Sequence, residues 1–148
     1  MIFLIWGINK KMATIERFED IIAWQKAREL SKKVYEITKT GGLSKDFKLK
    51  DQMTDSSGSI MDNIAEGFER GGNGEFIQFL GYAKGSSGEL RSQLYRILDQ
   101  EYITKAKFNE LYTLADDIGK MIKGLIDYLN STDIRGQKYK QEKIKKKH

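Results

Sequence analysis

Residues 59–70 read Ser-Ile-Met-Asp-Asn-Ile-Ala-Glu-Gly-Phe-Glu-Arg, and this stretch decides the fold. Ile60, Ile64 and Phe68 recur every four residues, so their side chains share one face of a helix. Gly67 lies where this helix is expected to end, because glycine ends helices more readily than it continues them. A Gly-rich turn follows at Gly71, Gly72 and Gly74. The stretch therefore predicts the turning point of a helical hairpin.

The polar residues of this stretch lie off its apolar face. They are Asn63, Glu66 and Arg70, and together with Gly67 they form a structural motif beside the turn. We interpret Glu66 as a hydrogen-bond partner near the end of the helix, either of Arg70 or of a neighbouring helix.

A four-and-three spacing of apolar residues continues on both sides and predicts four helices. Their expected bounds are residues 19–40, 46–66, 75–100 and 105–129. The first helix should end at Gly41-Gly42, and Ser44 and Thr104 are the expected N-caps of the second and fourth. Because the connections are short, consecutive helices should be antiparallel neighbours. The predicted fold class is all-α, an antiparallel up-down-up-down four-helix bundle, and the absence of proline agrees with unbroken helices.

Two helices carry a second stripe beside the apolar one. On the first helix the second stripe consists of Trp24, Ser31 and Tyr35. It indicates either that the core face of this helix is broad or that the helix contacts another subunit. On the third helix it consists of three glycines: Gly81, Gly85 and Gly88. Each glycine in a helix interior costs about 1 kcal/mol relative to alanine, so we expect another helix to pack unusually close there. The expected partner is the small, polar segment 56–59 of the second helix, with a subunit contact or a kink at Gly85-Ser86 as alternatives.

The formal charge of +5 is concentrated at the two ends of the 148-residue chain. Residues 134–148 carry seven lysines and arginines against one glutamate, and Lys10 and Lys11 add two more positive charges. The body, residues 12–133, is left with a formal charge of −3. The body is therefore not a basic domain as a whole, although its charge does not exclude a local cluster of basic residues on one face.

The two ends are expected to lie outside the bundle. Residues 1–11 begin with an apolar run that is too short to span a bilayer and lacks the features of a secretory signal. We interpret them as a non-native or flexible leader, with an apolar arm that docks on a neighbour as the alternative. Residues 134–148 lose the apolar period and are interpreted as a basic flexible tail, either disordered or a fraying helical extension. The bundle itself is expected to span residues 12–133.

The residue types in the body exclude several kinds of site. The absence of cysteine rules out disulfides and thiolate metal sites. The single histidine is the last residue, His148, so the body has no residue for a Ser-His triad or a histidine-ligated metal. The Gly-rich turn at residues 71–74 lacks the Gly-Lys-Ser/Thr ending of a phosphate-binding loop. No catalytic residue, metal ligand or cofactor is therefore assigned.

Three stretches together resemble the small bacterial four-helix bundle proteins named for intervening sequences in 23S rRNA genes. They are Phe18-Glu-Asp-Ile-Ile-Ala-Trp-Gln-Lys-Ala27, Ser59-Ile-Met-Asp-Asn-Ile-Ala-Glu-Gly67 with Phe68 and Arg70, and Glu75-Phe-Ile-Gln-Phe-Leu80 continuing into Ala83-Lys-Gly-Ser86 and Glu89-Leu90. The resemblance covers most of the body, residues 18–129. Each stretch alone is weak, whereas the set is specific.

This family is similar to the accessory bundle proteins of diversity-generating retroelements, which assemble as barrel-shaped homopentamers and associate with nucleic acid and a reverse transcriptase. The resemblance implies a homopentamer and nucleic-acid binding, and it implies no catalytic residue. The chain departs from the family at Gly41-Gly42-Leu43, where the family usually has a proline. It also has Thr54-Asp55-Ser56 where the family has basic and alanine residues, which weakens the case for nucleic-acid binding by that face.

The sequence and the resemblance together favour a nonenzymatic, cytoplasmic, oligomeric protein that binds nucleic acid, with structured RNA favoured. Phosphate contact needs clustered lysine and arginine. The candidates are Lys26, Lys32 and Lys33 on the first helix, Lys84, Arg91 and Arg96 on the third, and Arg135, Lys138 and Lys140 in the tail. The alternative interpretation of these charges is an ordinary solvated face and a solubilising tail.

Two other function classes stay open. One is a protein–protein interaction scaffold without nucleic-acid binding, which would use the second stripes and the apolar leader. The other is an enzyme that binds a divalent cation through Asp116-Asp117, or through Asp62 and Glu66 one helical turn apart. Carboxylates at such spacings are usually exposed helix charges, so the enzyme is the least favoured of the three classes. No membrane association is expected.

Overall fold

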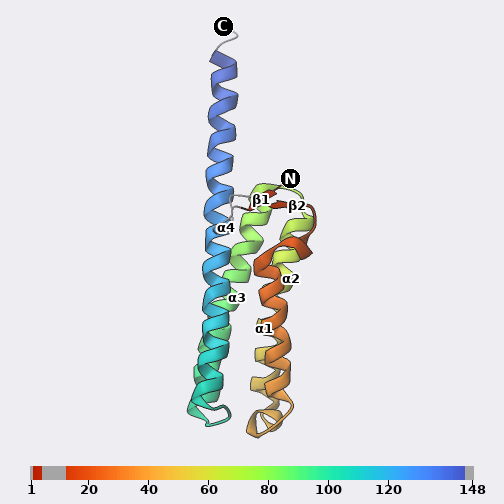
Figure 1. The fold of residues 1–148 in the computed structure, drawn as a ribbon, viewed down its shortest axis with the longest axis vertical. Helices are drawn as coiled ribbons and strands as arrows, with labels where there is room; N and C mark the ends of the chain where they lie inside the picture. Colours follow the sequence, from red (N-terminus) through yellow and green to blue (C-terminus); the bar gives the residue numbers. More distant parts are fainter. Residues whose placement is uncertain (1, 5–12, 146–148) are drawn as a thin grey trace.

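The computed structural model describes the backbone of residues 2–4 and 13–145 and the side chains of residues 15–132. Four long helices dominate it: α1 (Ile22–Thr38), α2 (Phe47–Glu69), α3 (Asn73–Asp99) and α4 (Lys105–Lys145). They run up and down beside one another, which confirms the predicted all-α four-helix bundle (Figure 1). Within the described part of the chain, no helix combines the length and apolarity needed to cross a membrane.

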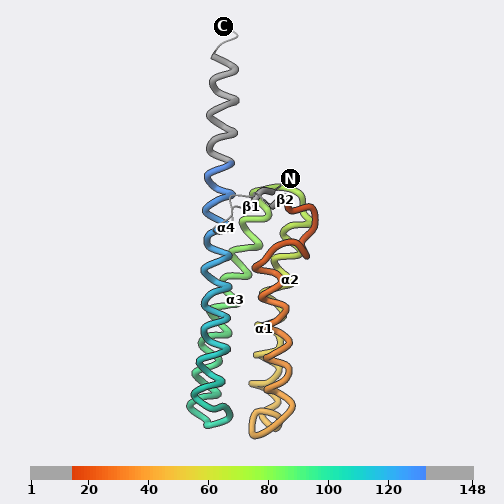
Figure 2. Tube along the Cα trace, viewed as in Figure 1, coloured from red at the N-terminus to blue at the C-terminus, as the bar shows by residue number. Residues whose placement is uncertain are grey.

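The core forms where the apolar stripes of the four helices meet. α1 packs against α2 and α4, and α3 packs against the same two helices, so α1 and α3 lie on a diagonal (Figure 2). Fully buried side chains at predicted apolar positions include Leu30, Ile60, Ile64, Leu90 and Ile118. Burying one such side chain contributes about 1.5–3 kcal/mol, so these stripes supply most of the driving force for folding.

The second stripe of α1 divides between the core and the surface. Ser31 is buried, and Trp24 is half-buried with its ring centroid 5.1 Å from that of Phe18. Tyr35 is 52% exposed. Trp24 and Ser31 therefore broaden the core face of α1, whereas Tyr35 does not.

The N-cap of α2 is Asp46, and the prediction of Ser44 is wrong. The Leu49 backbone N–H donates to Asp46 Oδ1 at 3.3 Å. The Ser44 hydroxyl donates instead to the Gly41 carbonyl at 2.6 Å, inside the short 3-10 turn that precedes α2. A carboxylate nearer the helix thus takes the capping position. Thr104 caps α4 as predicted.

Gly67 does not end its helix, because α2 continues to Glu69. The glycine that lets the chain turn is Gly71, whose φ of +81° lies in the left-handed region. Gly67 is buried, and a Cβ at this position would lie only 2.6 Å from the Cβ of Phe79 on α3. The residue therefore allows α2 and α3 to approach closely beside their turn.

The polar part of the motif beside the turn makes local contacts. Arg70 Nη2 donates to Glu66 Oε1 at 3.1 Å, which confirms the predicted pair. The Arg70 guanidinium also lies 5.1 Å from the centroid of the Phe79 ring. Asn63 Nδ2 donates to the carbonyl and the hydroxyl of Ser59, at 2.8 and 2.9 Å. These contacts support a structural role for the motif.

The glycine stripe of α3 marks no close approach within the bundle, so that prediction is wrong. Among the described residues, no neighbouring atom lies within 4 Å of a Cβ built at Gly81 or Gly85, and Gly58 of α2 is equally open. A Cβ at Gly88 would meet only Arg91 Nη2, at 3.7 Å. α3 is continuous through Gly85, so the helix does not end there. The two alternatives, a subunit contact and a kink at Gly85-Ser86, stay predictions.

Away from Gly67, polar side chains of three serines and one glutamine line part of the contact between α2 and α3. The Ser86 hydroxyl donates to Ser59 Oγ at 3.1 Å, and the buried Ser56 hydroxyl donates to Gln93 Oε1. We call these four residues the serine seam. The small serine side chains let the helices approach, and the hydrogen bonds among the four residues remove the cost of burying unpaired polar groups.

A short antiparallel ladder precedes the bundle, and the sequence did not predict it. β1 (Ile2–Leu4) pairs with β2 (Ala13–Ile15), with Ile2 opposite Ile15. Ile15 is buried in the core cluster of the bundle. The rest of the predicted leader, residue 1 and residues 5–11, lies outside the described residues.

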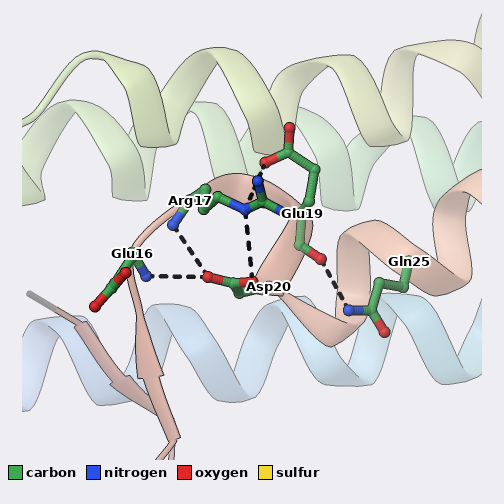
Figure 3. Close-up of polar contacts among 5 residues, drawn as sticks. All are labelled: Glu16, Arg17, Glu19, Asp20 and Gln25. Atoms are coloured by element: carbon green, nitrogen blue, oxygen red, sulfur yellow. Dashed lines mark hydrogen bonds and ion pairs between the residues drawn. The ribbon is translucent and has the colours of Figure 1, made fainter.

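The turn between β2 and α1 is closed by one carboxylate. Asp20 Oδ2 accepts from the backbone N–H groups of Glu16 and Arg17, both at 3.2 Å (Figure 3). Gln25 Nε2 donates to the Glu19 carbonyl at 2.8 Å and ties the first turn of α1 to the same loop. These bonds fix the loop that leads into α1, whose N-cap residue Ile21 makes no side-chain capping bond.

Candidate nucleic-acid interface

A narrow groove between α3 and α4 brings several basic side chains together. It encloses about 200 Å³ and is lined by Lys84, Arg91, Asp116, Gly119, Lys120 and Lys123. Within each helix most of these residues are three, four or seven positions apart, so each set lies along one helix face. We call this surface the α3–α4 groove.

Small side chains form the contact between the two helices beneath the groove. Ser87 of α3 is fully buried and donates to the Ala115 carbonyl of α4 at 2.7 Å. A Cβ at Gly119 would lie 3.4 Å from Ser87 Oγ. The helices are therefore held close here, and the long basic side chains occupy the two rims.

The charges of the groove are partly paired but remain positive overall. Asp116 lies between Lys120, with Nζ to Oδ2 at 3.0 Å, and Arg91, with Nη1 to Oδ1 at 3.5 Å. The hydrogen bond to Asp116 raises the pKa of Lys120 above its ordinary value. Lys123 Nζ lies 2.7 Å from Asp127 Oδ2. Four cations against one carboxylate in the lining make the groove attractive to anions.

Arg91 is the most firmly held of these cations. Its Cζ lies 5.8 Å from the centroid of the Tyr112 ring, and its Nη1 faces Asp116. Its Nε is buried and has no hydrogen-bond partner among the described residues. About a third of the side chain is still open to solvent, at 35%. The guanidinium is thus fixed in place and keeps the capacity to bind a further acceptor.

The groove continues along the same helix faces into an aromatic cluster, which we define as Tyr95, Phe108 and Tyr112. The Tyr95 ring centroid lies 5.0 Å from that of Phe108 and 5.6 Å from that of Tyr112. Phe108 is buried, whereas Tyr95 is 49% exposed. Lys105 Nζ lies 4.8 Å from the Phe108 centroid. The neighbouring Tyr112 raises the pKa of Tyr95 above its ordinary value, which already leaves the phenol neutral at physiological pH.

The predicted basic residues of α1 do not join the groove, because α1 lies diagonally across the bundle from α3. Lys26 pairs with Glu29 at 3.6 Å. Lys33 Nζ donates to Glu110 Oε1 of α4 at 2.7 Å, and this hydrogen bond raises the pKa of Lys33. Lys32 is exposed. These lysines therefore serve the α1–α4 contact or face solvent.

Arg96, another predicted basic residue, also lies apart from the groove. Arg96 Nη1 donates to Gln52 Oε1 of α2 at 3.1 Å, on the side of α3 away from α4. Arg135, Lys138 and Lys140 lie outside the residues whose side chains are described. The structure thus brings together Lys84 and Arg91 from the prediction, and it adds residues that the sequence reasoning missed. Those are Tyr95, Lys105, Tyr112, Lys120 and Lys123.

Replacing Glu110 with glutamine should slightly lower the thermal midpoint at neutral pH and flatten the loss of stability on acidification. Hydrogen bonds from Lys33 and Lys107 hold the pKa of Glu110 below its ordinary value. The stability from Glu110 is therefore present above its unfolded-state pKa and is lost as the pH falls through the folded-state pKa. Thermal melts of both proteins from neutral pH down to about pH 3 test this. Parallel profiles of midpoint against pH would contradict it.

Two of the four carboxylates considered as cation ligands have other partners. Asp116 is shared by Arg91 and Lys120, and Glu66 is paired with Arg70. Within residues 15–132, no group of three or more histidine, cysteine, aspartate or glutamate side chains could hold a metal ion.

A larger hollow lies beside the turn between α2 and α3. It encloses about 470 Å³ and is lined by Ile15, Glu16, Phe68, Gly71, Gly72, Asn73 and Phe76. The charged side chain in this lining is Glu16, which disfavours an anionic ligand. The α3–α4 groove is therefore the better candidate for a polyanion.

Comparison with known proteins assigns the family. The model of the 23S rRNA-intervening sequence protein matches residues 19–124, more than two thirds of the chain, so the chain belongs to that family. No curated protein matches the chain. One similar solved structure is the crystal structure of a protein with unknown function from the S23 ribosomal protein family of Bacteroides thetaiotaomicron VPI-5482. The two share 22% identity and a TM-score of 0.67, over 72% of this chain and 96% of that chain, so the likeness shows the fold alone.

Proposed function

We propose that this member of the 23S rRNA-intervening sequence protein family is a nonenzymatic, oligomeric protein that binds structured RNA through its α3–α4 groove. The observation that carries the proposal is the grouping of Lys84, Arg91, Lys120 and Lys123 on a body whose formal charge is negative. Clustered cations on one face are the electrostatic requirement for phosphate contact.

The ion pairs within the groove do not prevent such contact. Lys120 and Lys123 are paired through side chains that are 74% and 65% exposed. Exposed ion pairs contribute little to stability, so a phosphate can replace the carboxylate partner at small cost. Arg91 is held by Tyr112 and Asp116, which positions it before a ligand arrives.

Oligomerisation would multiply contacts that are individually weak. The resemblance to retroelement accessory proteins supports a homopentamer, and five grooves on one particle would raise avidity without any new contact. Arg135, Lys138 and Lys140 would add positive charge from the tail. Structured RNA as the ligand would place the protein in the cytoplasm.

A protein-interaction scaffold is the second candidate, and the outward-facing glycine stripe favours it. Gly81 and Gly85 are exposed, and Tyr82 beside them is 52% exposed. Light-scattering mass with the 260/280 nm absorbance ratio across the same peak separates the two functions. Nucleic acid that co-purifies with an oligomer and is removed by salt supports RNA binding, whereas a nucleic-acid-free oligomer favours the scaffold.

The triple variant Lys84→Gln/Lys120→Gln/Lys123→Gln should weaken RNA binding and its salt dependence together. Each phosphate contact contributes about 0.7–0.9 to the slope of log affinity against log salt, so the slope should fall by about 2. Fluorescence anisotropy of a labelled RNA hairpin, titrated at several salt concentrations, measures both quantities.

The matched control removes three exposed lysines away from the groove: Lys39→Gln/Lys45→Gln/Lys48→Gln. It changes the net charge by the same amount and should leave the slope close to that of the unmodified protein. Equal losses in both triple variants would show that overall charge, and not the groove, determines the affinity, and would contradict the proposed site.

A further inference from the structure

We propose that the α3–α4 groove selects RNA with an unpaired nucleotide, whose base stacks on Tyr95 while phosphates farther along the same strand contact Lys84, Lys120 and Lys123. This inference rests on the proposed function and names the feature of the RNA that the groove recognises. It assigns a role to the aromatic cluster, which phosphate binding alone does not use.

The stacking surface is the open ring of Tyr95. This residue is 49% exposed, although its ring contacts Phe108 and Tyr112 at centroid distances of 5.0 and 5.6 Å. The two neighbours support one side of the ring and restrict its motion, while the exposed part stays available. A ring held in this way loses little conformational entropy when a base stacks on it.

The position of the ring matches the position of the cations along the groove. Lys84, Arg91 and Tyr95 follow one another along a single face of α3, which places Tyr95 about 16 Å along the helix axis from Lys84. Arg91 lies between them and contacts Tyr112. A strand that enters at the lysines therefore reaches the ring after passing the arginine.

The ring is also electrically suited to a base beside phosphates. The neighbouring Tyr112 raises the pKa of Tyr95 above its ordinary value, so the phenol stays uncharged at neutral pH with a wider margin. Lys105, over the Phe108 ring, adds a cation at the same end. Arg91 lies over the Tyr112 ring, and both cations attract a phosphate backbone.

Two chemical features of the groove distinguish its occupant. A fully paired duplex presents phosphates but keeps its bases inside the helix, so it cannot use Tyr95. An acidic protein segment presents carboxylates but no aromatic base. An unpaired nucleotide in a loop or a bulge presents both a phosphate and a free π face, which is how proteins commonly read single-stranded RNA.

The test uses the full chain and three probes: an RNA hairpin with 2-aminopurine in its loop, a fully paired RNA duplex with the same number of phosphates, and polyphosphate. Tyr95→Leu should weaken hairpin binding about thirtyfold, the middle of the range for loss of one stacking contact. It should leave the affinities for duplex and polyphosphate unchanged within about twofold. The loop fluorescence should be quenched by the unmodified protein and by Tyr95→Phe, which keeps the ring, but not by Tyr95→Leu.

Tyr35→Leu is the matched control, because Tyr35 is 52% exposed on α1 and lies outside the groove. It should change none of the three affinities. An equal effect of Tyr95→Leu on hairpin and polyphosphate would overturn the stacking inference, as would an unquenched loop in the unmodified complex. If Tyr95→Leu binds the hairpin normally but the triple lysine variant does not, stacking fails and the proposed function survives. If no RNA probe binds in a salt-dependent way, the proposed function fails first.

Discussion

Gly67→Ala is expected to lower the free energy of unfolding by about 1–3 kcal/mol, although alanine is the better helix former. A Cβ at this position would lie 2.6 Å from the Cβ of Phe79 and 3.3 Å from Cδ1 of Phe76. A Cβ atom close to the backbone cannot rotate away, so α2 and α3 would have to separate beside their turn. That strain outweighs the gain of about 1 kcal/mol in helix propensity.

Denaturant unfolding at one fixed protomer concentration measures the effect, because the stability of an oligomer depends on concentration. Gly85→Ala is the matched control: it lies within α3, and no neighbouring atom among the described residues lies within 4 Å of the added Cβ. It should stabilise the chain by up to about 1 kcal/mol. A stabilising Gly67→Ala would contradict the close approach. A destabilising Gly85→Ala together with a loss of oligomer mass would indicate that the glycine stripe is a subunit contact.

Leu90→Ala is expected to destabilise the bundle by about 2–5 kcal/mol, the usual cost of removing a fully buried leucine. Leu90 has no exposed surface and lies near the middle of α3, the helix that packs against both α2 and α4. The removed methyl groups lose their transfer free energy, and the surrounding helices cannot collapse fully into the cavity. Because a domain of this size is stable by only about 5–15 kcal/mol, this single change removes a large part of the total.

In Leu90→Ala, the urea concentration at the midpoint of unfolding should fall, while the slope of the unfolding free energy against urea concentration stays the same. Leu114→Ala on α4 is the comparison, since Leu114 is only half-buried at the edge of the core. It should cost clearly less than Leu90→Ala. Equal losses would mean that Leu114 is covered in the assembled protein, whereas a small loss at Leu90 would contradict the core described above.

The class and order of the helices followed from apolar spacing, because burial of one face of each helix contributes most of the stability of a helical bundle. Leu30, Ile64, Leu90 and Ile118 lie in the core as their spacing predicts. Helix ends were less predictable, since they depend on which of several nearby polar groups reaches the first free N–H groups. Asp46 and Ser44 were both suitable caps by composition, and only the geometry of the turn decides for Asp46.

The glycines show why a residue type does not determine its own role. Gly67 was expected to end a helix and instead allows close packing, whereas Gly81 and Gly85 were expected to allow close packing and instead lie open. The difference depends on which helix lies opposite each glycine. That information is absent from the spacing within one helix.

Only part of the candidate RNA-binding site could be predicted from the sequence, for a similar reason. Lys84 and Arg91 were singled out on α3, but Lys120 and Lys123 on α4 are separated from them by the turn between the helices and by many residues of chain. The signal that would have found them is the pairing of antiparallel helices: residues after the turn lie opposite residues at a similar distance before it. Tyr95 and Tyr112 meet across the same pair of helices.

The serine seam also limits how α2 and α3 can slide past each other. A four-and-three apolar pattern repeats every seven residues, so sliding one helix by a heptad would still set apolar side chains against apolar side chains. The bond between the buried Ser56 hydroxyl and Gln93 does not repeat in this way. The shift by seven residues that sets Gln93 opposite Leu49 would bury its amide without this partner, at a cost of about 1–3 kcal/mol. The apolar stripes thus make the two helices associate, and the polar pair selects one alignment among those that the stripes alone would permit.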